Sequence, residues 1–182
     1  LGKNPFQKKI NFKQSASLEA QIASISDDVA YNSHDIEDGL KEKLFKIEDL
    51  KKISVISEII KKNKKKFYKV DNDIFIRELV RNLINEMVSD LIKNTIKNLE
   101  KNQIKNNKDV YKSKNCLVTF SKSMQNFDKE IKSFLKYKMY FNPKVKKKTD
   151  KGKKIIKFLF KKISTKPYKF IKKDKNYKDL SR

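Results

Sequence analysis

The sequence contains very little glycine, proline or cysteine. Its 182 residues include three glycines, three prolines and one cysteine, Cys116. Because tight turns use glycine and proline, we do not expect a turn-rich β-sandwich or β-barrel. A single cysteine cannot form an intrachain disulfide, which fits a reducing, cytoplasmic compartment. No apolar run approaches the ~18–20 residues of a membrane span, so we expect no membrane partner.

Arginine is also scarce, although the chain is strongly basic. Lysine and arginine number 46 against 22 acidic residues, for a net charge of +24, yet only Arg77, Arg81 and Arg182 are arginines. Arginine is the residue suited to bidentate recognition of phosphates and bases. The abundant lysine, asparagine, isoleucine and phenylalanine share A/T-rich codons, so we favour genome composition as the cause. A non-catalytic helical module that binds nucleic acid through lysine–phosphate contacts is the alternative.

The spacing of apolar residues predicts an all-α chain of at least five helices. We expect an irregular lead-in over 1–14, a helical domain over 15–165 and a basic tail over 166–182. The clearest helix is capped by Asp71 or Asp73 and has one apolar face at helical spacing. That face comprises Ile76, Leu79, Val80, Leu83, Met87 and Leu91.

Weaker patterns complete the expected fold. Segment 41–62 is expected to form a helical pair and 101–114 a loop. Ser121 or Ser123 caps a further helix, and Pro167 ends the last one. The apolar faces of these two helices consist of Phe127, Ile131, Phe134 and Leu135, and of Ile155, Ile156, Leu159, Phe160 and Ile163.

One segment departs from this lysine-rich background. All four alanines and the only histidine of the chain lie between residues 16 and 34. On a helical wheel the apolar residues fall within about 60° of one another, and Ala20, Ala23 and Ala30 flank a polar stripe on the other side. We therefore predict a helix over 18–35 that is buried on both faces, with a break at Gly39. Its core residues are expected to be Leu18, Ile22, Ile25 and Val29.

The polar stripe consists of Asp27, Tyr31, His34 and Asp35, which fall within roughly 100° of one another. Carboxylates at this spacing can hold a divalent cation, accept hydrogen bonds from sugar hydroxyls, or pair with lysines. The residues alone leave these three uses open. A metal needs more ligands than the stripe holds, and one histidine cannot complete a multi-histidine site.

The segment SLEAQIASISDDVAYNSHDIEDGL resembles a helix of the bacterial deoxyguanosine-triphosphate triphosphohydrolase-like proteins, in the superfamily named for its His-Asp (HD) metal motif. RELVRNLINEMVSDLI and LVTFSKSMQNFDKEIKSFLKYKMYFNPKV resemble later segments of that family. The resemblance implies the C-terminal helical part of an HD-domain fold. It also implies that Asp27 ligates a divalent metal, Mg or Mn, that Tyr31 packs on the nucleotide, and that Asp35 receives the sugar 3′-hydroxyl. His34 and Asp35 do not match the family's metal-binding pair, although they spell it.

The resemblance is incomplete. The family's first metal-binding histidine, its His-Asp pair and its catalytic histidine precede the matching region, and this sequence holds no counterpart of them. We therefore expect the C-terminal part of a longer protein or the product of a truncated gene, with no catalytic residue and no activity alone. For the complete protein the resemblance implies hydrolysis of a deoxynucleoside triphosphate to deoxynucleoside and triphosphate, and we expect a homo-oligomer.

Other residues have simpler interpretations. Arg77 and Arg81 are candidates for phosphate binding, and a salt bridge to a carboxylate is an equal alternative. Asp90 falls on the apolar side of its helix, where a paired structural acid is expected. Cys116 is expected to be a small buried residue.

Overall fold

A computed structural model describes residues 14–63 and 71–170 of the chain. The predicted lead-in therefore lies almost wholly outside the described residues, as does most of the predicted tail. The chain divides into two compact units, residues 1–139 and residues 140–182, and each is considered separately. Over the described ranges the structure contains helices and no strand, so the all-α prediction is confirmed.

Seven α-helices and two short helical turns make up the described structure. The helices of the first unit are α1 (Leu18–Lys41), α2 (Ile47–Leu50), α3 (Ser54–Lys62), α4 (Asn72–Lys101), α5 (Asn107–Lys112) and α6 (Lys122–Leu135). A π-helical turn at Lys136–Tyr140 crosses the boundary between the units. The second unit holds α7 (Pro143–Thr165) and a 3₁₀ turn at Pro167–Lys169.

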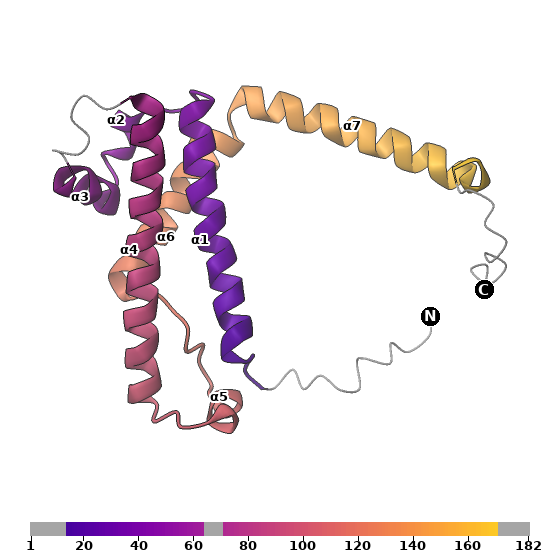
Figure 1. The fold of residues 1–182 in the computed structure, drawn as a ribbon. Helices are drawn as coiled ribbons and strands as arrows, with labels where there is room; N and C mark the ends of the chain where they lie inside the picture. The colour runs from indigo at the N-terminus through magenta and orange to yellow at the C-terminus, as the bar shows by residue number, and fades with distance from the viewer. Residues whose placement is uncertain (1–13, 64–70, 171–182) are drawn as a thin grey trace. The chain divides into compact units, whose positions relative to one another are not determined.

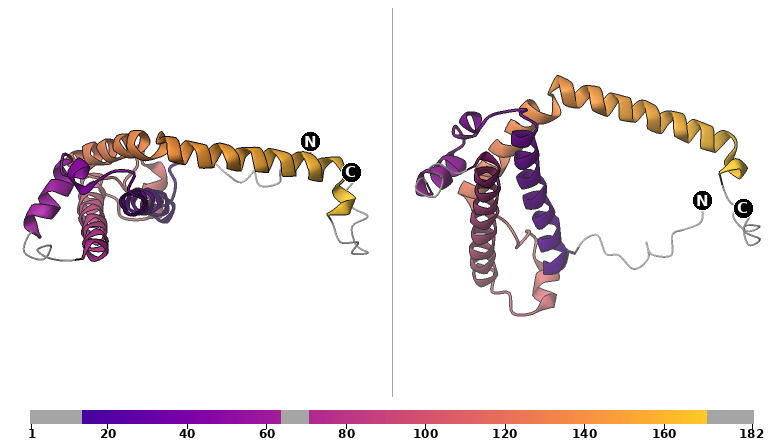
Figure 2. Two further views of the ribbon diagram at one scale, coloured as in Figure 1. Left: turned by 90° about the horizontal axis from the view of Figure 1, so that it is seen from above. Right: turned by 45° about the horizontal axis from the view of Figure 1, so that its top comes forward.

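The first unit is built on two long helices, α1 and α4, which lie side by side and run in opposite directions (Figures 1 and 2). Helix α3 packs on α4, and α6 packs on α1. Every apolar residue predicted for the face of α4 is buried, from Ile76 to Leu91, and Asp71 is the N-cap. This part of the fold follows directly from apolar residues at helical spacing.

Helix α6 also begins where the sequence predicts. Ser121 is its N-cap and accepts a hydrogen bond from the backbone N–H of Met124 at 3.3 Å. The two oxygens of Asp90, on α4, accept hydrogen bonds from the Ser121 backbone N–H and hydroxyl at 2.8 and 2.6 Å. Asp90 is therefore the paired structural acid that the sequence predicts, and it joins the start of α6 to α4.

Helix α1 continues through Gly39, so the predicted break there is wrong. A Cβ at Gly39 would collide with the ring of Phe45. Phe45 is 5% exposed and contacts Phe134 edge to face, with ring centroids 4.9 Å apart. The glycine is explained by this close approach of an aromatic ring, and a helical backbone accommodates it.

The expected loop over 101–114 contains a short helix, α5, which was not predicted from the sequence. Its start is fixed locally by a capping box between Asn106 and Asp109. The Asn106 side chain accepts hydrogen bonds from the backbone N–H groups of Lys108 and Asp109. A helix of six residues offers no apolar periodicity, so capping chemistry is its main sequence signal.

The segment between α5 and α6 is held along α4 by two asparagines spaced one turn apart. The side-chain amide of Asn94 donates to the Thr119 carbonyl at 2.7 Å, and that of Asn98 donates to the Leu117 carbonyl at 2.9 Å. These bonds satisfy backbone carbonyls that have no helix or sheet partner. They place Leu117 and Val118 in the core, where both are almost fully buried.

Candidate functional site

The candidate site lies on α1. The face of α1 that packs against the bundle determines which of its residues remain exposed. Ser17 caps the helix and accepts a hydrogen bond from the Ala20 backbone N–H at 3.3 Å. The face toward the bundle buries Val29, Ile36 and Leu40. Leu18 and Ile25 are half-buried and pack against the core, as predicted. Ile22 is 47% exposed, so its predicted core position is wrong.

The opposite face of α1 is exposed. Asp27, Tyr31 and His34 are exposed, with Tyr31 at 65%, and Asp35 is half-buried. Ala20, Ala23 and Ala30 are exposed beside them. The prediction that α1 is buried on both faces is therefore wrong for this structure, because α4 and α6 both pack on the other side. The four residues of the predicted polar stripe do share one side of the helix.

Three polar residues of α1 are buried, and the sequence did not predict their burial. They are Gln21, Asn32 and Ser33. The Gln21 side-chain oxygen accepts hydrogen bonds from the backbone N–H groups of Leu117 and Val118 at 2.9 and 3.1 Å. Its amide nitrogen donates to the Ala16 carbonyl at 2.8 Å. Gln21 thus ties the start of α1 to the segment that precedes α6.

Cys116 lies beside this contact. Its thiol sulfur is 3.1 Å from the Gln21 side-chain oxygen, but the residue is exposed. The prediction of a buried cysteine is therefore wrong. The burial begins one residue later, at Leu117, where the backbone turns its N–H toward Gln21.

A polar cluster joins α1 to α6 next to the exposed face. The Asn32 side-chain amide donates a hydrogen bond to the Asp128 carboxylate at 3.0 Å. The Lys132 ammonium bridges Asp128 and Asp28, at 2.9 and 3.0 Å. Partial burial, the largest single influence, lowers the pKa of Lys132, but hydrogen bonds and charges from Asp128 and Asp28 together raise it above its ordinary value. The cluster opposes rotation of α1 about its axis.

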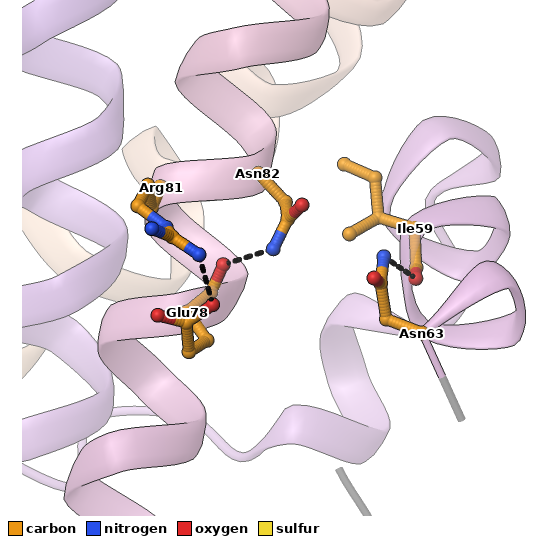
Figure 3. Close-up of polar contacts among 5 residues, drawn as sticks. All are labelled: Ile59, Asn63, Glu78, Arg81 and Asn82. Carbon is orange, nitrogen blue, oxygen red and sulfur yellow. Dashed lines mark hydrogen bonds and ion pairs between the residues drawn. The ribbon is translucent and has the colours of Figure 1, made fainter. Parts of the chain in front are cut away.

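The arginines considered for phosphate binding lie on α4. Arg77 is exposed. The Arg81 guanidinium pairs with the Glu78 carboxylate at 2.7 Å, as Figure 3 shows, and its side chain is 72% exposed. In the same view, the Asn82 amide donates to the Glu78 carbonyl at 2.6 Å. The salt bridge considered as an alternative therefore exists for Arg81, and an exposed pair of this kind is weak enough to open for a phosphate.

The described residues do not make up a complete metal site. Over 14–63 and 71–170, no three histidine, cysteine, aspartate or glutamate side chains come together in a way that could hold a metal ion. A divalent cation prefers several oxygen or nitrogen ligands. On the exposed face of α1, Asp27 offers one carboxylate, so any metal bound there needs ligands from elsewhere.

Comparison with known proteins assigns the C-terminal third of the chain to a class of domain. Residues 118–177, which include α6 and α7, match the family model of the phosphohydrolase-associated domain. This class is helical and accompanies phosphohydrolases, in agreement with the fold described above.

The whole chain has curated relatives. It is 46% identical over 182 residues to a deoxyguanosinetriphosphate triphosphohydrolase-like protein of Pelagibacter ubique (strain HTCC1062), covering all of this chain and 49% of that protein. Proteins of the same name from Bartonella quintana (strain Toulouse) and Rhizobium meliloti (strain 1021) are 36% and 32% identical over 145 and 130 residues, or 80% and 71% of this chain. These matches cover 36% and 32% of the two relatives.

The chain is a homologue of the deoxyguanosinetriphosphate triphosphohydrolase-like proteins. It spans about half the length of the Pelagibacter ubique relative and about a third of the other two. The family resemblance predicted from the sequence is therefore confirmed. Among the described residues, no helix is both long enough and apolar enough to cross a membrane.

Proposed function

We propose that the exposed face of α1 forms one wall of the active site of a deoxynucleoside triphosphate triphosphohydrolase. The observation that supports this proposal is that Asp27, Tyr31 and the half-buried Asp35 share one side of a helix, in a chain homologous to deoxyguanosinetriphosphate triphosphohydrolase-like proteins. The alanines beside them leave room for another polypeptide or a ligand to approach the helix closely.

Each residue of the stripe has a distinct role in the proposal. Asp27 contributes one carboxylate ligand to a divalent cation, Mg or Mn. Asp35 lies eight residues further along α1, a rise of about 12 Å, and accepts a hydrogen bond from the sugar 3′-hydroxyl. Tyr31, between them, packs against the sugar and disfavours a ribose 2′-hydroxyl. The order along the helix thus follows the substrate from its phosphates to its sugar.

The remaining elements of the proposal concern the complete enzyme. Its substrate is a deoxynucleoside triphosphate, and its products are the deoxynucleoside and triphosphate. The other metal ligands and the general acid come from polypeptide beyond the residues that this chain contributes, so the chain alone is inactive. Arg77 and Arg81 remain candidate phosphate ligands, and the complete protein is a homo-oligomer in the cytoplasm.

A nucleic-acid-binding module is the second candidate, favoured by the net charge of +24. Binding through lysine–phosphate contacts releases counterions that are condensed on the nucleic acid. This release becomes less favourable as the salt concentration rises, so the binding weakens steeply. Tight, salt-dependent binding of DNA or RNA by the chain, together with no effect of the α1 stripe on hydrolysis, favours this candidate over the first.

The test uses a full-length chain in which this sequence replaces the matching half of the Pelagibacter ubique relative. Triphosphate release from dGTP is measured with Mn²⁺ or Mg²⁺. Asp27→Asn should reduce turnover at least about a hundredfold. Loss of this carboxylate weakens the hold on the cation that stabilises the negative charge developing on the reacting phosphate in the transition state. Asp28→Asn is the matched control. It alters the adjacent acid, whose partner is Lys132, and should change turnover by less than about threefold. Equal turnover in the two variants contradicts the proposal.

A further inference from the structure

Helix α7 is a long, basic helix with no buried side chain. It spans 23 residues and carries ten lysines against one aspartate. Asn142 caps its start by accepting a hydrogen bond from the Lys144 backbone N–H at 3.0 Å, and Pro143 occupies its first turn. The helix is therefore well defined by its own capping, and every one of its side chains is at least partly exposed.

The apolar residues of α7 gather on one side of the helix. On a helical wheel they occupy an arc of about 140°, which Lys148 enters near one edge. We call this set the α7 apolar arc; it consists of Val145, Ile155, Ile156, Leu159, Phe160 and Ile163. Ile156 and Phe160 are 68% and 73% exposed. Phe158 points to the lysine side, where the Lys162 ammonium lies 5.4 Å from its ring centroid.

An exposed apolar arc between rows of lysines indicates a binding surface. Soluble proteins rarely leave such a contiguous patch uncovered. Nucleic acid would engage the lysines and leave the arc in water. A second α7 would cover the arc but bring ten lysines against ten more, which is unfavourable.

The relatives indicate which polypeptide supplies the cover. This chain aligns over its whole length, α7 included, with 49% of the Pelagibacter ubique protein. The other half of that protein is polypeptide that could pack on α7. Helix-in-groove packing uses apolar anchors at the spacing of this arc. The surrounding lysines require acidic groups at the edges of the groove.

We propose that the α7 apolar arc docks into an acidic-edged apolar groove on the half of the dGTPase-like polypeptide that this chain does not match. Phe160 and Leu159 are its anchors. Lysines such as Lys153 and Lys157 flank the arc on the Phe160 side and face the acidic edge of the groove. The inference does not rest on the proposed activity, because it concerns how two halves of a protein pack and not what they hydrolyse.

The experiment co-produces this full chain with the unmatched half of the Pelagibacter ubique relative as a separate, tagged polypeptide. Complex formation is measured by co-purification, and its dissociation constant by titration of the purified partners. Phe160→Asp should weaken the complex at least about tenfold, because it places a charge at an anchor position that the groove buries when the complex forms. Phe158→Asp is the matched control, since Phe158 is 62% exposed on the same helix but lies outside the arc. It should change the dissociation constant by less than about threefold.

Several outcomes overturn the proposal. These are the absence of a one-to-one complex, equal weakening by both variants, and stronger weakening by Phe158→Asp. Two parallel measurements test other occupants with the chain alone. If the chain binds phosphatidylserine vesicles and Phe160→Asp abolishes this binding, the arc is assigned to a lipid surface instead. If the chain self-associates and Phe160→Asp abolishes this self-association, the arc is assigned to a second copy instead. A one-to-one complex that lacks dGTP hydrolysis supports this proposal while counting against the proposed function.

Discussion

The buried amide of Asn32 on α1 donates a hydrogen bond to the Asp128 carboxylate on α6, 3.0 Å away. The Asp128 carboxylate also receives the Lys132 ammonium at 2.9 Å. This one acid therefore holds a buried amide and a partly buried cation. Because Asn32 follows Tyr31 directly, the contact fixes the side of α1 that turns away from the bundle.

Asp128→Ala should destabilise the first unit. It leaves the Asn32 amide, which is 6% exposed, without its carboxylate acceptor, and an unsatisfied buried donor costs about 1–3 kcal/mol. Urea unfolding followed by circular dichroism measures the loss. Lys129→Ala, on the exposed side of α6, is the control and should change the free energy of unfolding by less than about 0.5 kcal/mol. Equal stability of the two variants would count against the role given to Asp128.

Two glycine substitutions should have opposite signs. Gly39→Ala places a methyl group against the Phe45 ring and should destabilise the protein by about 1–3 kcal/mol. Gly152→Ala meets nothing within 4 Å on α7 and should stabilise that helix by about 0.5–1 kcal/mol. Thermal unfolding followed at a helix band of the circular dichroism spectrum measures both changes. A stabilising Gly39→Ala would show that Phe45 does not occupy that space.

Gln21→Leu should free the segment that precedes α6. The backbone N–H groups of Leu117 and Val118 lose their acceptor, at a cost of about 1–3 kcal/mol. Amide hydrogen exchange at these two residues should accelerate in the variant. Ser24→Ala, on the exposed part of α1, is the control and should leave the exchange rates unchanged. Unchanged protection of both amides in Gln21→Leu would refute the contact.

The dependence of stability on alkaline pH should involve Lys132. Its pKa is raised above 10.5 in the folded chain by Asp128 and Asp28, which outweigh the opposing effect of burial. Folding therefore favours the charged amine, so its contribution is complete below pH 10.5 and is lost as pH rises through the folded-state pKa. The difference in unfolding free energy between the native chain and Lys132→Met should stay constant from neutral pH to about pH 10.5. It should shrink at higher pH, as the ammonium group of the folded chain loses its proton. A difference that grows with alkaline pH would contradict the assignment.

The sequence predicts much of the fold because local patterns determine it. Apolar spacing locates the buried face of α4, and the serine and aspartate caps locate the starts of α4 and α6. The missed helix α5 had only a local capping signal, whereas other failures concern long-range partners. The burial of Gln21 depends on backbone groups near residue 117, which lie far away in the sequence. The helical wheel of α1 identifies a polar stripe but cannot show which face another helix covers.

The candidate site is predictable only in part for a related reason. Composition and spacing select Asp27, Tyr31 and Asp35, and the structure shows that they share one side of α1. Family resemblance gives them roles, and residue spacing does not. The Asn32–Asp128 contact that orients this side escapes prediction, because no pattern links residues 96 positions apart.

The most direct test of the account is the metal content of the full-length chain that combines this sequence with the unmatched half of the Pelagibacter ubique relative. The protein is equilibrated with Mn²⁺, freed of unbound ion and analysed for metal per chain, as native protein, as Asp27→Ala and as Asp35→Ala. The account predicts that Asp27→Ala loses the metal and turnover. Asp35→Ala should keep the metal and raise the KM for dGTP about tenfold or more, since a hydrogen bond to a charged acceptor contributes about 1.5–3 kcal/mol. Loss of metal in Asp35→Ala with retention in Asp27→Ala would contradict the account, because the metal-binding acid would then belong to the His34–Asp35 pair.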